Sequence, residues 1–118
     1  MSKKSLLVLR VGLACVFLAN ALTAWLSPDE FKGLIEGSFL THLFPAISSS
    51  LFVTLILIND GLLSLIFLFN LKIIKPALIW ASIYLVLVML VIWEPLDGLE
   101  HLGFLAMSVA LYLELKTT

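Results

Sequence analysis

The chain has 118 residues, of which 62% are hydrophobic and 13% are charged, and its mean hydropathy is +1.16. Soluble domains are about 45–50% apolar and about 25% charged, and a water-soluble globule of this size could not cover so much apolar surface. The net charge of −1 and the absence of a basic stretch exclude a nucleic-acid-binding protein, and the hydrophobicity excludes a disordered chain. Composition therefore predicts one integral membrane domain, residues 1–118, whose surroundings are the lipid bilayer.

Four apolar stretches are predicted to cross the hydrocarbon as helices, because a spanning helix needs about 20 residues. They cover residues 6–26, 46–71, 76–93 and 99–115. The first stretch also resembles a secretory signal, since Lys3 and Lys4 precede it and Ala19-Asn20-Ala21 could be a cleavage site. Because Arg10 interrupts the apolar run, which continues to Leu26, we interpret this stretch as a permanent helix.

A short helix is expected between the first two spans. Ser27-Pro28-Asp29-Glu30 has the pattern of a helix start, with a serine cap, a proline at the first position and acids in the first turn. Gly37 is the expected stop. Phe31, Leu34 and Ile35 fall on one face, so the sequence predicts an amphipathic helix lying in the membrane interface.

The starts of the last two spans carry familiar signals. Pro76 is expected at the first position of the third span, where a missing amide hydrogen has no consequence. The turn before the fourth span contains Asp97, Gly98 and Glu100, which repeat the capping pattern. The fold class predicted from these elements is all-α, a bundle of four transmembrane helices with an interfacial helix between the first and second.

Charged residues are distributed unequally between the two sides of this bundle. With four spans, one side holds both termini and six of the seven basic residues, namely Lys3, Lys4, Arg10, Lys72, Lys75 and Lys116. The other side holds six of the eight acids, namely Asp29, Glu30, Glu36, Glu94, Asp97 and Glu100. Basic loops remain in the cytoplasm, so we expect a multi-pass protein of the cell membrane with both termini cytoplasmic.

Several polar residues lie within the predicted spans. An unpaired charge near the middle of a bilayer costs about 2.5 kcal/mol or more, so the carboxyl in the second span should be protonated, paired or in contact with water. The candidate cluster consists of Arg10, Asn20, Asn59, Asp60 and Ser64, in which Arg10 is the available cation. Two interpretations stay open: polar contacts that hold helices together, or a proton or ligand site.

A second group of polar residues belongs to the opposite side of the bundle from the termini. Two histidines and three acids could form an outer-face site, namely His42, Glu94, Asp97, Glu100 and His101. Their spacing matches no metal-binding motif, so solvated or interfacial histidines are favoured and no metal is predicted. Cys15, the one cysteine, allows no intrachain disulfide and no thiolate cluster. No nucleophile-base pair or phosphate loop indicates a catalytic residue, and an enzyme is the less favoured interpretation.

Five short segments occur in a recognisable order along the chain. They are Leu9-Arg10-Val11-Gly12-Leu13, Trp25-Leu26-Ser27-Pro28-Asp29-Glu30-Phe31, Asn59-Asp60-Gly61-Leu62-Leu63, Leu99-Glu100-His101-Leu102-Gly103 and Ala110-Leu111-Tyr112-Leu113. This order resembles the DoxX-like family of small four-helix membrane proteins, and the resemblance extends over essentially the whole chain. The family commonly has glutamate where this chain has Asp60.

The resemblance implies a non-catalytic subunit or scaffold of a membrane-associated complex. Some members are associated with thiosulfate-to-quinone electron transfer and others with oxidative-stress complexes, so the implied cofactor is a quinone and the implied partner is another membrane protein or a second copy. The residues themselves require no cofactor. The alternative is a proton-coupled small-molecule transporter that uses Asp60. Small multidrug-resistance exporters have a glutamate in the first helix, which this chain lacks. A third hypothesis is a small enzyme using the outer histidine and acid residues.

Overall fold

A computed structural model describes residues 1–92 and 95–117, and all of the regular structure in these two ranges is helical. The molecule is elongated, with extents of 45 × 25 × 21 Å. In chain order the helices are α1 (Lys3–Leu26), α2 (Pro28–Glu36), α3 (Leu40–Leu43), α4 (Ser49–Leu68), α5 (Ile74–Ile92) and α6 (Pro95–Lys116). Four of them, α1, α4, α5 and α6, are long and apolar enough to cross a membrane. The predicted bundle of four such helices and a short helix is confirmed.

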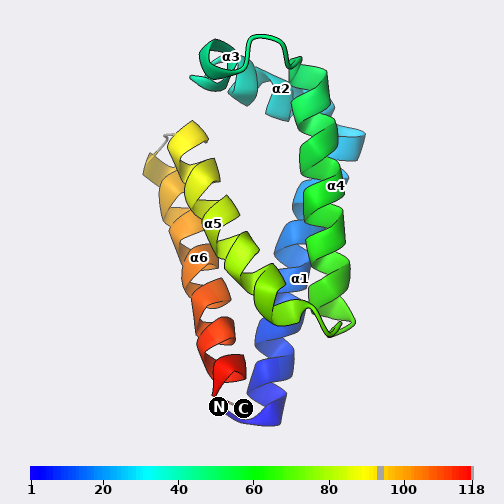
Figure 1. Cartoon of the computed structure of the whole chain (residues 1–118), viewed down its shortest axis with the longest axis vertical. Helices are drawn as coiled ribbons and strands as arrows, with labels where there is room; N and C mark the ends of the chain where they lie inside the picture. Colours follow the sequence, from blue (N-terminus) through cyan, green and yellow to red (C-terminus); the bar gives the residue numbers. More distant parts are fainter. Residues whose placement is uncertain (93–94, 118) are drawn as a thin grey trace.

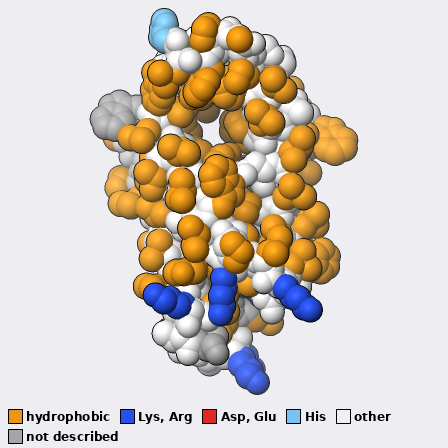
Figure 2. Space-filling view, viewed as in Figure 1, with side chains coloured by type: hydrophobic (Ala, Val, Ile, Leu, Met, Phe, Trp, Pro, Cys, Tyr) orange, Lys and Arg blue, Asp and Glu red, His pale blue; other side chains and the backbone are white. Residues whose placement is uncertain are grey.

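The long helices form two pairs. α1 packs along α4, and α5 packs along α6, while contacts between the pairs are fewer. In Figure 1 the pairs converge at the end that holds both termini and separate toward the other end, where α2 and α3 lie across the bundle. Most exposed side chains on the visible face are hydrophobic, and basic side chains gather at the end with the termini (Figure 2). This distribution is that of helices whose sides face lipid.

Aromatic and aliphatic side chains fill the space between the two pairs near the termini. Phe17 and Phe67 are fully buried, and their ring centroids are 5.7 Å apart. Leu78 and Leu111, also buried, come from the second pair. Within that pair the Ser82 and Ser108 hydroxyls lie 2.9 Å apart. The closely packed half of the bundle is therefore the half that contains both chain ends.

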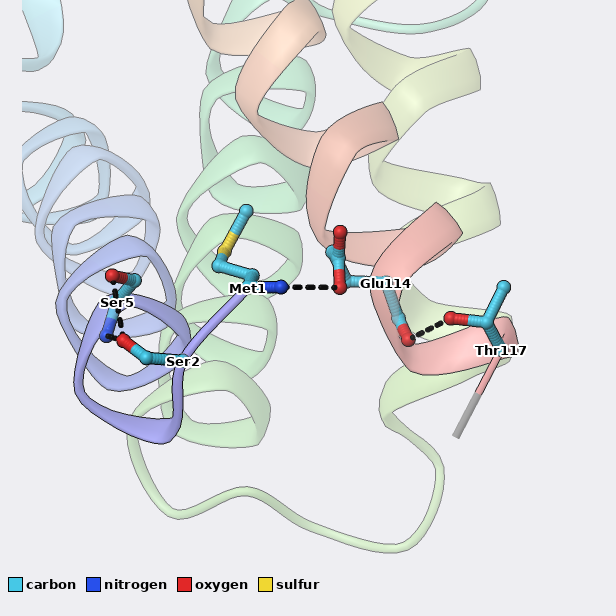
Figure 3. A network of polar contacts seen from close by, with 5 residues as sticks. All are labelled: Met1, Ser2, Ser5, Glu114 and Thr117. Carbon is cyan, nitrogen blue, oxygen red and sulfur yellow. Dashed lines mark hydrogen bonds and ion pairs between the residues drawn. The ribbon is translucent and has the colours of Figure 1, made fainter.

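The two ends of the chain also meet. The Met1 ammonium lies 3.5 Å from the Glu114 carboxylate on α6, and Figure 3 shows this contact beside the Ser2 cap. Ser2 accepts a hydrogen bond from the Ser5 amide at 3.1 Å. α1 therefore begins at Lys3, three residues before the predicted start of the first span.

The ends of α4 differ from the predicted span 46–71 because of local capping. Ser48 accepts a hydrogen bond from the Leu51 amide at 3.1 Å, so the helix begins at Ser49. At the other end Asn70 adopts a left-handed conformation with φ 51°, and the Leu71 amide donates to the Ile66 carbonyl at 3.1 Å. This bond is that of a Schellman motif, which ends a helix.

Three predicted capping patterns need correction. α5 begins at Ile74, so Pro76 is its third residue, although still in the first turn. α6 begins at Pro95, and Asp97 lies in its first turn instead of capping it, because a proline is well suited to the first position. The side chain of Ser27 precedes α2 but makes no capping hydrogen bond. α2 itself and its end at Gly37 are as predicted. The predicted end of the third span at Trp93 lies outside the described residues.

Candidate functional site

A cavity of about 300 Å³ lies between the helix pairs where they separate. Its walls are apolar side chains of α4 and α5, and α2 and α3 contribute Phe31, Leu34, Ile35 and Leu40 at the end away from the termini. The α5 lining extends from Tyr84 to Ile92, a rise of about 12 Å in a helix. In Figure 2 a hollow is visible between the pairs near that end. The cavity extends along α5, and its lining is mostly apolar.

The α2 helix is fixed over the cavity by its apolar face. Ile35 is 4% exposed and packs with Ala24 of α1 and Val53 of α4, which are also buried. Glu36 accepts a hydrogen bond from the Ser49 hydroxyl at 2.8 Å. The apolar face predicted for this helix therefore makes two kinds of contact. Ile35 packs against the bundle, and Phe31 and Leu34 line the cavity.

Asp60 provides the acidic group of the cavity. Its side chain is 1% exposed, and Oδ1 accepts a hydrogen bond from the Asn59 Nδ2 at 3.0 Å. Asn59 Oδ1 in turn accepts from the Trp80 Nε1 of α5 at 2.7 Å. This chain of bonds orients the carboxyl from one side. Asp60 Oδ2 is buried and has no hydrogen-bond partner among the described residues.

Side chains of three further helices surround the same carboxyl. Asn20 of α1, Tyr84 of α5 and His101 of α6 all line the cavity and lie close enough to interact with Asp60. His101 Nδ1 lies 2.7 Å from the Asp97 backbone carbonyl. Because a carbonyl oxygen only accepts, His101 Nδ1 carries a proton. The polar side chains that line the cavity are therefore those of Asn20, Asp60, Tyr84 and His101.

Of the predicted intramembrane cluster, the structure brings together Asn20, Asn59 and Asp60 but not the other two residues. Arg10 is separate from Asp60: its Nη1 donates to the carbonyls of Phe67 at 2.9 Å and Leu68 at 3.0 Å. These carbonyls belong to the last turn of α4, which lacks intrahelical partners. Ser64 is buried one turn below Asp60, and its hydroxyl donates to the Gly61 carbonyl at 2.7 Å.

The predicted outer-face site is not assembled among the described residues. His42 is exposed on α3, and Glu100 is exposed on α6. Glu94 lies outside the described residues. No three His, Cys, Asp or Glu side chains of the described ranges lie close enough together to hold a metal ion. His101, expected to be solvated or interfacial, instead lines the cavity.

Sequence reasoning missed Tyr84 and Trp80 as parts of the site. The sequence favours bundle packing or an interfacial anchor for Tyr84, because aromatic residues concentrate at membrane interfaces, and it assigns no role to Trp80. Their spacing of four residues places them on one side of α5, and their rings lie 6.2 Å apart. The position of Tyr84 near the middle of an apolar span could have indicated a role in the site, since a buried tyrosine hydroxyl needs a hydrogen-bond partner.

Comparisons with known proteins add no relative: no protein family, curated protein or solved structure matches this chain. The interpretation of the cavity therefore depends on its own geometry.

Proposed function

We propose that the protein is a non-catalytic membrane subunit that binds a lipophilic molecule whose head group donates hydrogen bonds. The single observation that supports this most is Asp60 Oδ2, a buried acceptor that has no hydrogen-bond partner among the described residues and lies at a mostly apolar cavity. Buried polar atoms are nearly always hydrogen-bonded. A ligand that donates to Asp60 would supply the missing bond, while its apolar part would occupy the space between α4 and α5.

A quinol is the ligand class that we propose. Its ring is apolar and carries two hydroxyl donors. One hydroxyl could donate to Asp60 Oδ2, and the other could donate to His101 Nε2 when that ring is neutral. The hollow between the helix pairs (Figure 2) would allow such a molecule to enter the cavity. The resemblance to the DoxX-like family supports the same class. In this proposal the chain binds and orients the quinol, and electron transfer belongs to a partner membrane protein that carries a redox cofactor.

The proposed location is the cell membrane, with both chain ends in the cytoplasm. The basic side chains at the end that holds the termini support this orientation. The cavity would then lie toward the outer surface, below α2 and α3.

Equilibrium binding of a short-chain quinone analogue, in its reduced and oxidised forms, tests the proposal. The purified protein is expected to bind the quinol more tightly than the quinone. Asp60→Asn replaces an acceptor with an amide that can also donate, so we expect at least about a tenfold loss of quinol affinity, which corresponds to about 1.4 kcal/mol. The matched control is Asp29→Asn, because that carboxylate is 97% exposed. Equal affinities of the Asp60→Asn variant and the control would refute the proposal.

Proton-coupled transport through Asp60 is the second candidate. The observation that favours it is the position of this acid, which is buried among the apolar helices and faces the cavity. Below Asp60 the space is filled by Phe17, Leu63 and Phe67, so the path toward the termini is closed. Transport would require a second conformation in which this packing opens. In liposomes, substrate-driven proton movement that persists unchanged in Asp60→Asn would remove this candidate.

A further inference from the structure

A second, smaller cavity lies at the opposite end of the bundle, beside the termini. Its volume is about 170 Å³, and it is bounded by α1, α6 and the turn between α4 and α5. Lys3 and Arg10 of α1 and Asn70 of the turn supply its polar groups. Its other walls are leucine side chains of α1 and α6. The cavity therefore combines two basic groups with an apolar surface.

The positive charge in this cavity is not neutralised by the described residues. Arg10 uses only Nη1 for its bonds to α4, and no described residue accepts a hydrogen bond from its other nitrogens. The α4 carbonyls hold the guanidinium in place, so its remaining donors are oriented before any ligand arrives. Lys3 forms no ion pair within residues 1–92 and 95–117. Glu114, an acid at this end, instead contacts the Met1 ammonium (Figure 3).

We propose that this cavity binds the headgroup phosphate of an anionic phospholipid. Guanidinium and ammonium groups form charge-assisted hydrogen bonds with phosphate oxygens, and basic pockets between membrane helices take anionic lipid headgroups. The leucines beside Lys3 and Arg10 give the first segments of the acyl chains an apolar surface. A free phosphate ion would use the basic groups and leave this surface uncovered. The site is independent of the quinol cavity at the other end of the bundle.

Native mass spectrometry of the purified full chain can measure this binding. Phosphatidylglycerol and phosphatidylcholine with the same acyl chains are titrated separately, and the anionic lipid is expected to bind more tightly. Lys3→Gln should weaken phosphatidylglycerol binding about fivefold, the change that corresponds to about 1 kcal/mol per basic residue. Arg10→Gln should weaken it further. If that variant does not fold because α4 loses its cap, Lys3→Gln still provides the test, since Lys3 is exposed at the first position of α1.

Lys4→Gln is the matched control. Lys4 is the neighbouring residue, carries the same charge and is exposed, but it does not line the cavity. Equal losses in Lys3→Gln and Lys4→Gln would show a general surface attraction and overturn the proposal. Equal binding of the two lipids would overturn it as well. Inorganic phosphate is added as a competitor, and displacement of the lipid by low millimolar phosphate would assign the site to a free anion instead.

Discussion

The side chain of Arg10 on α1 joins this helix to the end of α4, its neighbour in the first helix pair. Arg10→Met keeps a long apolar side chain and removes both hydrogen bonds to the carbonyls of Phe67 and Leu68. A hydrogen bond to a charged group contributes about 1.5–3 kcal/mol in soluble proteins, whereas side-chain hydrogen bonds between membrane helices average about 0.6 kcal/mol. Since one of the two bonds is exposed, we expect the free energy of unfolding to fall by about 2 kcal/mol.

The measurement is a titration with denaturing detergent in mixed micelles, followed by circular dichroism. Lys4→Met is the matched control because it removes the same charge from an exposed position on the same helix. A surface substitution of this kind changes stability by less than about 0.5 kcal/mol. If Arg10→Met and Lys4→Met were equally stable, the α4 carbonyls would not depend on Arg10.

A double-mutant cycle with Asp60→Asn separates this contact from an ion pair with Asp60. The carbonyl of Phe67 is seven residues from Asp60, or about 10 Å along the helix. Substitutions this far apart add to within about 0.5 kcal/mol, so the double variant should lose the sum of the two single losses. A coupling energy above about 1 kcal/mol would show that Arg10 and Asp60 interact, and would refute the assignment of Arg10 to the α4 carbonyls.

Three further substitutions test the packed half and the cavity separately. Phe17→Ala removes a fully buried ring that contacts Phe67, and detergent unfolding should show a loss of about 3 kcal/mol. Ser108→Ala removes the contacts of this hydroxyl with the Ser82 hydroxyl and the Leu78 carbonyl. It should cost about 1 kcal/mol in the same assay, and unchanged stability would show that these contacts do not stabilise the pair. Val88→Trp places a large side chain in the wall of the cavity beside Asp60. It should lower affinity for the reduced quinone analogue at least about tenfold with unfolding little changed, and normal affinity would show that the ligand binds elsewhere.

The existence and order of the spanning helices could be predicted from sequence because length and hydropathy alone determine them. Hydropathy does not determine where the helices end, since the ends depend on individual capping groups. Ser48 caps α4, and the helix therefore begins at Ser49 instead of the predicted residue 46. Asn70 ends the same helix through a left-handed turn, and Asn accepts this conformation more readily than most residues do. Pro95 similarly begins α6 four residues before the predicted start.

Part of the candidate site could also be predicted, because polar residues in the middle of an apolar span stand out from the residues around them. Asp60 and Asn59 are adjacent in sequence, and their mid-span depth identified them directly. Arg10 was assigned to the same cluster because a cation is the usual partner of a buried acid. Backbone carbonyls at a helix end compete for that cation, and the chain turns there within reach of Arg10. The sequence alone could not predict that the end of α4 lies beside Arg10, because this depends on how the helices pack.

His101 illustrates the remaining difficulty. Its position near the start of the fourth span made it look like a residue at the membrane surface. The helix pairs separate toward that end, so the cavity extends down from it and the ring lines this space. Whether a residue faces water, lipid or a cavity depends on the angle between helix pairs, which periodicity within one helix does not encode.

The separation of the bundle into two unlike halves explains why binding and stability should respond to different substitutions. Near the termini, Phe17 and Phe67 fill the interior and Arg10 caps α4, so these groups hold the two pairs together. Toward α2 and α3 the same pairs are apart, and helix contact is replaced by the cavity walls. Asp60 lies at the boundary, where Asn59, itself held by Trp80, donates to one carboxyl oxygen, and the other oxygen has no partner within residues 1–92 and 95–117. A ligand bound to that oxygen would contact both helix pairs. It should therefore raise the free energy of unfolding with the logarithm of its concentration above Kd, by about 2.7 kcal/mol at 100 times Kd.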